Sequence, residues 1–412
     1  MPVVNRIADY APQMTEWRRY LHTIPELGND CFKTAAFVAE RLRDFGVDEL
    51  HEGFATTGIV AIINGQAEGP TIGLRADMDA LPIPEETGLD YASTHAGKMH
   101  ACGHDGHTTM LLGAAKYLAE TRNFAGRVAL IFQPAEETGG GAEVMVEEGI
   151  LDRFDIGQVY ALHNAPGFEK GGFYTSPGAM MAAVDEFHIH IKGLGGHGAT
   201  PHLTRDPVVA ACGIATALQT IVSRNIPAQD PAVLTVGAMQ VGETHNVIPE
   251  TGTLKLNLRW FDKGVRQTML DAIDRETRGI AVAAGGPKER EPTITMLGYA
   301  EPVINEPALA EKANATLVGA LGKKRIMPGI PPVMGSEDFP MLVAGIDDAE
   351  TLFVEVGGGA PDVMKKYMSS GELPPLNHNP KFRIENPGLA ITTAVQANST
   401  LLLDAFLAGG AE

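Results

Sequence analysis

Apolar positions in the first part of the chain follow two patterns. Apolar residues recur at helical spacing over three ranges, 6–22, 34–45 and 108–119. Short continuous apolar runs have the length of buried strands at 71–76, 127–133 and 158–162. Helices that alternate with buried strands predict an α/β fold built on a parallel or mixed sheet.

The pattern changes near Val184, where apolar and polar residues begin to alternate one by one. Such alternation predicts strands with one buried and one solvent-exposed face. Asp206-Pro207 is typical of a helix N-cap followed by the first helical position. The predicted elements then follow the order β-α-β-β-α, at 184–192, 206–223, 232–241, 251–261 and 263–284. This order predicts a separate α+β two-layer domain inserted into the first one.

The first pattern resumes after about residue 295. We predict a helix at 307–320, a core strand at 351–356 and a final helix from Asn386 to about Ala408. A chain of 412 residues also exceeds one typical hydrophobic core. The predicted organisation is therefore a discontinuous domain of residues 1–183 and 296–412, with an inserted domain at 184–295.

Metal-ligating side chains are concentrated between Met99 and His107. Nine residues hold one thiol, three imidazoles and one carboxylate, which belong to Cys102, His100, His104, His107 and Asp105. Thiol and imidazole ligands suit zinc, manganese, cobalt or nickel ions. The stretch is expected in a loop that enters the helix at 108–119. Asp105 would either hydrogen-bond a ligand or cap this helix, with the cap favoured, and His100 and His107 are interpreted as flanking groups.

Carboxylates and a histidine follow the three predicted strands. Asp77 and Asp79 follow the first strand, Glu136 and Glu137 the second, and His163 the third. Strand ends of this kind carry the binding groups of α/β folds. The adjacent glutamates point to different sides, so one can bind a metal while the other faces the reacting water. Taken alone, the two aspartates could equally be turn-forming residues.

Charge and cysteine content narrow the classes of partner. A formal net charge of −19 disfavours nucleic acid and anionic membrane surfaces. The three cysteines are widely spaced and odd in number, which argues against a disulfide framework and fits a reducing cytoplasm. The first residues lack the pattern of a signal peptide, and we expect no stretch long enough to span a bilayer. We therefore expect a cytoplasmic protein that acts on a small molecule.

Taken together, these motifs resemble the M20 peptidase family, specifically its amidohydrolase and aminoacylase branch, which includes hippurate hydrolases and auxin-conjugate hydrolases. The matching stretches occur in family order along nearly the whole chain. They are Leu21-His22 with Pro25-Glu26-Leu27, Arg75 to Pro82, Met99 to His107, Gln133 to Glu137, Ala161 to His163, Gly195 to His197 with Pro201-His202, Asn246 to Pro249, Gly335 to Phe339, and His378 to Phe382.

The resemblance implies a mixed-sheet catalytic domain with an inserted lid that often serves for dimerisation. A homodimer or tetramer would follow. It also implies two divalent metal ions, whose identity among zinc, manganese, nickel and cobalt is open. Carried over residue by residue, the ligands would be Cys102, His104, Glu137, His163 and His378. Cys102 would bridge the two ions.

The resemblance also implies roles for five further residues. Glu136 would be the general base, and Asp79 would orient a ligand from behind. His197 would stabilise the developing oxyanion, in some relatives from the partner subunit. Asn246 and Arg259 would hold the carboxylate of the substrate, and a guanidinium suits that task because it binds a carboxylate in a two-pronged manner.

The predicted activity is metal-dependent cleavage of the amide bond of N-acyl amino acids to a carboxylic acid and an amino acid. One alternative is a metallo-carboxypeptidase or dipeptidase of the same family, and another is a non-catalytic, metal-dependent binding protein. A peptidase would need an acidic partner for a free α-amino group, and the sequence offers no committed one. Asn164-Ala165 replaces a more usual apolar and aromatic pair, so these positions are expected to border the pocket and affect substrate choice.

Overall fold

The computed structural model describes residues 2–285, 290–327, 329, 331–344, 350–359, 361–371 and 374–384. The chain divides into two compact units. Unit 1 comprises Met1–Met180, Ile304–Pro331 and Asp338–Glu412, and unit 2 comprises Met181–Val303 and Pro332–Glu337. The final helix predicted from Asn386 to Ala408 lies outside the described residues.

Unit 1 is built on a seven-stranded mixed sheet, in agreement with the predicted α/β class. The strands are β1 (Glu49–Phe54), β2 (Gly58–Asn64), β3 (Ala67–Asp77), β4 (Ala125–Gln133), β5 (Ile156–Glu169), β6 (Phe173–Tyr174) and β15 (Glu350–Gly359). Their order is β1-β2-β4-β3-β5-β15-β6. The central strands β4, β3, β5 and β15 run parallel, so their carboxyl ends meet at one edge.

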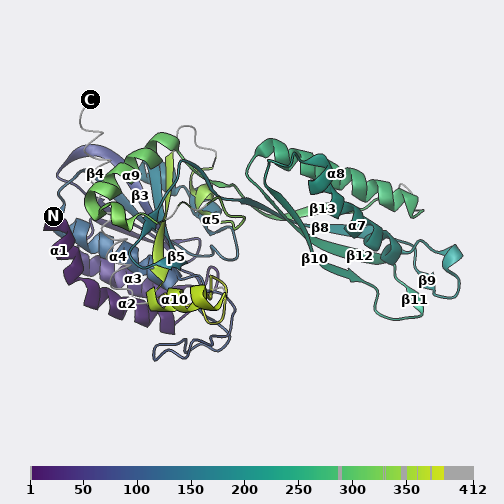
Figure 1. The fold of residues 1–412 in the computed structure, drawn as a ribbon, viewed down its shortest axis with the longest axis horizontal. Helices are drawn as coiled ribbons and strands as arrows, with labels where there is room; N and C mark the ends of the chain where they lie inside the picture. Colours follow the sequence, from purple (N-terminus) through teal and green to yellow (C-terminus); the bar gives the residue numbers. More distant parts are fainter. Residues whose placement is uncertain are drawn as a thin grey trace. The chain divides into compact units, whose positions relative to one another are not determined.

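Helices cover both faces of this sheet, in which strands such as β2 and β4 are buried at nearly every position. The helices of unit 1 are α1 (Pro2–Asp9), α2 (Ala11–Thr23), α3 (Phe32–Phe45), α4 (His104–Thr121), α5 (Gly141–Glu147), α6 (Ile150–Phe154), α9 (Pro307–Leu321) and α10 (Pro361–Ser370). Figure 1 shows α2, α3 and α4 together. These three helices share one hydrophobic cluster with alternate residues of the strands, such as Val128, Leu130 and Phe132.

Two helices of unit 1 begin or break where the apolar pattern alone does not show it. The range 6–22 is divided at Tyr10 into α1 and α2. Helix α4 begins at His104 rather than at Thr108, directly after Gly103, whose left-handed φ of 91° turns the chain into the helix. The last four of the nine residues predicted as a loop therefore belong to the first turn of α4.

Unit 2 is a two-layer α+β structure. Its antiparallel sheet has the order β10-β12-β8-β13, from β8 (Ala183–Lys192), β10 (Ala232–Val241), β12 (Thr251–Trp260) and β13 (Thr293–Ala300). The helices α7 (Pro207–Asn225) and α8 (Lys263–Ala283) lie side by side along this sheet (Figure 1). As predicted, the Asp206 side chain caps α7 by accepting a 2.8 Å hydrogen bond from the Val208 N–H.

The boundaries of unit 2 differ from the predicted range 184–295. Strand β13 pairs with β8, with Ile294 opposite Ile189, and this pairing extends the unit to Val303. Residues 332–337 also belong to unit 2, because the Ala182 N–H donates to the carbonyls of Val333 and Gly335. The apolar pattern missed β13, an edge strand with mostly exposed or half-buried side chains.

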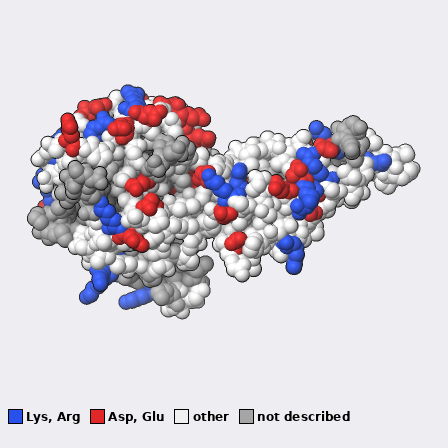
Figure 2. Space-filling view, turned by 90° about the horizontal axis from the view of Figure 1, so that it is seen from above, with Lys and Arg blue, Asp and Glu red and all other residues white. Residues whose placement is uncertain are grey.

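Helix α7 is long and apolar enough, by length and composition, to cross a membrane, contrary to the expectation from sequence. The core helix of a globular unit passes the same test, so this finding carries little weight. Ala211, Ile214 and Leu218 of α7 are buried in the hydrophobic cluster of unit 2. Figure 2 shows acidic side chains gathered over unit 1 with basic ones between them.

Candidate active site

Three parallel strands and one helix bring the predicted ligand residues of unit 1 together. Asp77 ends β3, and Glu136 and Glu137 follow β4. His163 lies within β5, which continues to Glu169 rather than ending at Leu162. It still emerges at the same edge, because β3 pairs with β5 only as far as Ala161. His104 begins α4, and Cys102 lies in the loop directly before it.

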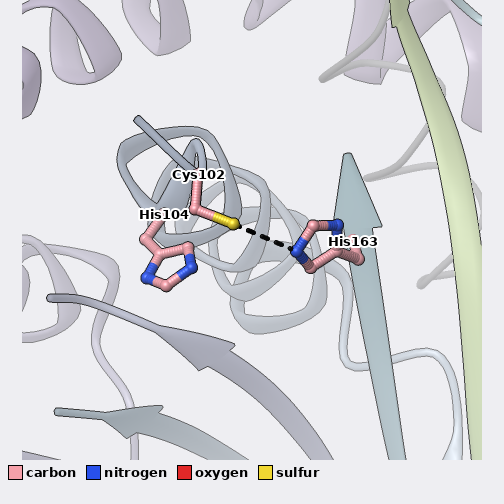
Figure 3. Close-up of side chains that lie close together, drawn as sticks. All are labelled: Cys102, His104 and His163. Atoms are coloured by element: carbon pink, nitrogen blue, oxygen red, sulfur yellow. Dashed lines mark hydrogen bonds between the residues drawn. The ribbon is translucent and has the colours of Figure 1, made fainter. Parts of the chain in front are cut away.

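Cys102, His104 and His163 form one compact donor group (Figure 3). The Cys102 Sγ lies 3.6 Å from the His163 Nε2. The His163 Nδ1 lies 2.9 Å from the Asn164 carbonyl oxygen, to which it must donate, so Nδ1 carries a proton and Nε2 faces the sulfur. The ligand atoms of the three side chains all lie within 4.8 Å of one another.

Cys102 also belongs to a second donor group, with Glu137 and His378. The His378 Nε2 lies 3.4 Å from the Glu137 Oε2. The backbone of His378 has a left-handed φ of 65°, and its N–H donates to the Ala101 carbonyl at 2.8 Å. This bond ties a distant part of the sequence to the loop that carries the thiol. The sulfur thus lies in both groups, as a shared ligand must.

Unsatisfied buried atoms show that these residues fit metal ions. Both ring nitrogens of His104 are buried without a hydrogen bond, and so is the Glu137 Oε1. The His104 nitrogens have oxygens of four carboxylates at 3.6–3.8 Å, too far for a hydrogen bond. Leaving buried polar atoms unpaired is costly. A divalent cation of zinc, manganese, cobalt or nickel type would satisfy this mixture of sulfur, nitrogen and oxygen donors.

The electrostatics of the cluster hold the thiol in its ligand form. Burial raises the pKa of Cys102, but the neighbouring imidazoles, His104 first among them, outweigh burial and bring it well below its usual range. Burial lowers the pKa of His104, but Asp77 and Asp79 more than compensate and hold it well above its usual range. Hydrogen bonds with Cys102 and Glu137 raise the pKa of His378 to about 10. Thiolate is the form that binds metal.

Asp79 holds the turn that presents the two glutamates. Its carboxylate accepts hydrogen bonds from the N–H groups of Glu136 at 3.0 Å and Glu137 at 3.1 Å. Ala135 precedes them with a left-handed φ of 55°. The Asp79 Oδ1 also lies 3.6 Å from the His104 Nδ1. Asp79, which was predicted to orient a ligand, thus acts mainly by holding the backbone of Glu136 and Glu137.

Asp77 is a buried ion-pair partner rather than a turn-forming residue. Its carboxylate lies 2.9 Å from the Arg75 guanidinium and 2.6 Å from the His107 Nδ1. The other ring nitrogen of His107 accepts a hydrogen bond from the Asn164 N–H at 3.0 Å. Both nitrogens of His107 are therefore occupied, and His107 supports the site without being available as a ligand.

Asp105 does not cap α4, contrary to the favoured interpretation. The N-cap position is Gly103, which offers no side chain. Asp105 is buried, and its Oδ2 lies 2.8 Å from the Arg18 Nε and 2.9 Å from the His22 Nδ1. His22, interpreted from sequence as structural or solvated, is structural and lies 3.3 Å from Glu85 on its other side.

Asn164, which was expected to border the pocket, faces the loop before α4. Its side chain is buried, and its Nδ2 donates to the Cys102 carbonyl at 2.8 Å. Sequence reasoning also missed Asn377, whose Nδ2 donates to the Cys102 Sγ at 3.2 Å. Its position directly before the predicted ligand His378 could have indicated that Asn377 lies at the site. The buried contacts of Arg75 and Gln133 with Asp338 were missed because they join residues that are distant in sequence.

Unit 2 holds the three remaining predicted residues but brings only two of them close together. His197 lies in β9 (Gly196–His197), which pairs with β11 (Val247–Ile248), directly after Asn246. Both side chains are exposed. Arg259 lies near the other end of β12, roughly 26 Å along the extended strand from Thr251. There it contacts Ser336 and donates to the Asn257 Oδ1 at 2.8 Å.

Metal-ligating donors that lie beside carboxylates at the carboxyl edge of a mixed sheet are typical of metal-dependent hydrolases. The sequence pattern of peptidase family M20/M25/M40 matches residues 73–375. The chain belongs to this family.

Three relatives illustrate the similarity. A hippurate hydrolase of Campylobacter jejuni is 41% identical over 339 residues, which cover 82% of this chain and 87% of the relative. An N-acyl-L-amino acid amidohydrolase of Geobacillus stearothermophilus is 44% identical over 289 residues, which cover 69% and 77%. A crystal structure from Bacillus subtilis, described as a dinuclear metal-binding peptidase of family M20, superposes with a TM-score of 0.79 at 30% identity and covers 97% of this chain and 99% of that one.

The buried His22 generates a prediction about stability and pH. Burial lowers the pKa of His22, but the charge of Asp105 and hydrogen bonds with Asp105 and Glu85 raise it above 6.5 overall. The ion pair should therefore stabilise the fold fully below pH 6.5, and this contribution should vanish as pH rises through the folded-state pKa. We expect His22→Gln to lower the free energy of unfolding by about 1.5–3 kcal/mol at low pH and by less at high pH.

The measurement is urea unfolding of both proteins between pH 5 and pH 9. The exposed His245 provides a control, and His245→Gln should follow the wild-type curve at every pH. A wild-type advantage over His22→Gln that grows with pH would contradict a protonated His22 in the folded state.

Proposed function

We propose that this protein hydrolyses the amide bond of N-acyl amino acids and releases a carboxylic acid and an amino acid. The observation that carries the proposal is the placement of Glu136 beside the donor cluster, with its backbone held by Asp79. The names of the relatives support the same substrate class.

The residues that would hold two divalent ions are Cys102, His104, Glu137, His163 and His378. Cys102 is the proposed shared ligand, because its sulfur lies in both donor groups. When bound, such ions supply a water of lowered pKa and polarise the carbonyl of the substrate. Their identity among zinc, manganese, cobalt and nickel is left to experiment.

Glu136 is the proposed general base and acid. It accepts the proton of the attacking water and returns that proton to the leaving nitrogen. Glu137 is the less suitable of the pair, because its Oε2 already faces His378. Since Asp79 binds the N–H groups of both glutamates, the two side chains leave the turn in defined directions. A protein that only binds metal would have no use for such a base.

His197 is the proposed oxyanion donor, and Asn246 and Arg259 are the proposed carboxylate-binding residues. Because His197 and Asn246 lie far along the sheet of unit 2 from Arg259, one copy of unit 2 does not gather all three around one substrate. We therefore propose a homodimer in which the partner subunit contributes His197 and Asn246. The exposed positions of both side chains suit this arrangement. We also propose that the protein works in the cytoplasm, where its thiols stay reduced.

A substrate panel tests the proposed activity. Protein stripped of metal by a chelator should be inactive, and zinc, manganese, cobalt or nickel should restore cleavage of acetyl, benzoyl or indoleacetyl amino acids. Simple dipeptides belong in the same panel, because the alternative is a peptidase of the same family. Preferential cleavage of dipeptides would replace the proposal with that alternative.

Glu136→Gln should separate metal binding from turnover. The amide keeps the size of the side chain but cannot accept the proton, so we expect kcat to fall by roughly 100- to 10,000-fold. Metal content, measured by mass spectrometry, should stay at the wild-type value. Glu137→Gln is the matched variant and should lose metal as well as activity. Near-normal kcat in Glu136→Gln would show that another group moves the proton.

Mixing two inactive variants tests the contribution of the partner subunit. Glu136→Gln and His197→Ala should each be inactive alone. After joint refolding, a mixed dimer would contain one site with an intact Glu136 and an intact His197 from different chains. We expect up to about one quarter of wild-type activity, because half of the dimers are mixed and each has one complete site. No recovery from a verified mixed dimer would place His197 in the site of its own chain.

A further inference from the structure

The buried side chain of Asn164 lies between the two segments that carry the thiol and imidazole ligands. Its Nδ2 donates to the Cys102 carbonyl at 2.8 Å and contacts the His107 Nε2 at 2.5 Å. Only 4% of the residue is exposed. The amide therefore joins β5, which carries His163, to the loop before α4, which carries Cys102.

The backbone of Asn164 acts on the neighbouring ligand. Its carbonyl oxygen accepts the hydrogen bond from the His163 Nδ1 at 2.9 Å. This bond fixes the orientation of the His163 ring, whose Nε2 faces the Cys102 Sγ at 3.6 Å (Figure 3). One residue thus orients His163 through its carbonyl and the Cys102 backbone through its amide.

Gly103 shows how closely the amide fits. A Cβ at this position would lie 2.4 Å from the Asn164 Nδ2 and 2.9 Å from its Cγ. The left-handed φ of 91° is itself unfavourable for other residues. The turn between the ligands Cys102 and His104 is therefore shaped around the side chain of Asn164.

His107 gives the amide a fixed neighbour. The His107 Nδ1 donates to the buried Asp77 carboxylate at 2.6 Å, which leaves its Nε2 as an acceptor toward Asn164. The Asn164 Oδ1 is buried and has no hydrogen-bond partner among the described residues. An unpaired acceptor destabilises a fold, so the value of this side chain lies in its two donor hydrogens.

We propose that Asn164 is a positioning residue for metal binding, which holds the Cys102 loop against β5 so that the thiolate and the His163 imidazole face a common point. This inference rests on the proposed metal-dependent function. It assigns the residue to metal affinity rather than to substrate choice. Hydrogen-bonding partners behind metal ligands typically affect metal affinity by 10- to 100-fold.

Cobalt(II) binding to the metal-free protein tests the assignment without any substrate. Asn164→Leu keeps the approximate volume and removes both donors. We expect its Co²⁺ dissociation constant to rise by about 10- to 100-fold, with a weakened or shifted thiolate-to-cobalt absorption band. Asn314→Leu is the matched control, since the half-buried Asn314 also donates to a backbone carbonyl, that of Thr175, at 3.1 Å, outside the donor cluster. It should leave the dissociation constant and the band unchanged.

Thermal unfolding of the metal-free variants separates positioning from simple loss of stability. The two leucine variants should lose similar amounts in Tm, while only Asn164→Leu changes cobalt binding. If Asn164→Leu does not fold, Asn164→Asp replaces it, because aspartate has the same shape and at neutral pH lacks the donors. If the Asn164 variant that folds has the wild-type Co²⁺ dissociation constant and the wild-type thiolate-to-cobalt absorption band, Asn164 is not a positioning residue for metal binding. Asn164→Leu could show the expected loss of Co²⁺ affinity while the wild-type protein hydrolyses no substrate of the panel. That result would overturn the proposed activity but not the role of Asn164.

Discussion

Buried carboxylates must have hydrogen-bond or ion-pair partners, and this constraint shapes unit 1. Asp77, Asp79 and Asp105 are almost completely inaccessible, and an unpaired charge in such a place would be very costly. Each one therefore determines where a neighbouring segment can lie. Asp79 binds the turn after β4, Asp77 binds His107 of α4, and Asp105 ties α4 to Arg18 of α2. The ligand side chains occupy positions that these three carboxylates define.

The sequence predicted the elements and the donor residues better than it predicted what supports them. Apolar periodicity located β10 and α8 almost to the residue, because α8 buries one face and β10 alternates between exposed positions and more buried ones over most of its length. The carboxylates and histidines at strand ends were visible because parallel strands deliver them to one edge. Asp105 was misinterpreted as a helix cap and the inward contact of Asn164 was not foreseen, since their partners lie far away in the chain. Only the folded structure shows that a polar residue faces inward to a partner rather than outward to water.

Unit 2 illustrates a related limit. Alternating strands indicate which residues share a face but give no distance along the sheet. Asn246 and Arg259 are near neighbours in sequence and share a predicted task, yet most of β12 extends between them. The pairing of β9 with β11 instead places His197 beside Asn246. A pattern of residue types can thus assign a candidate role to residues of one domain without showing which of them lie close together.

The bond between the His378 N–H and the Ala101 carbonyl has a consequence for the chain as a whole. Cys102 and His378 belong to one donor group, although all of unit 2 lies between them in sequence. An ion held by both would act as a cross-link that closes a loop of roughly 275 residues and lowers the entropy of the unfolded chain. After a protease cut in a surface loop of unit 2, such an ion would add to the pairing of β5 with β15 in holding the two fragments together.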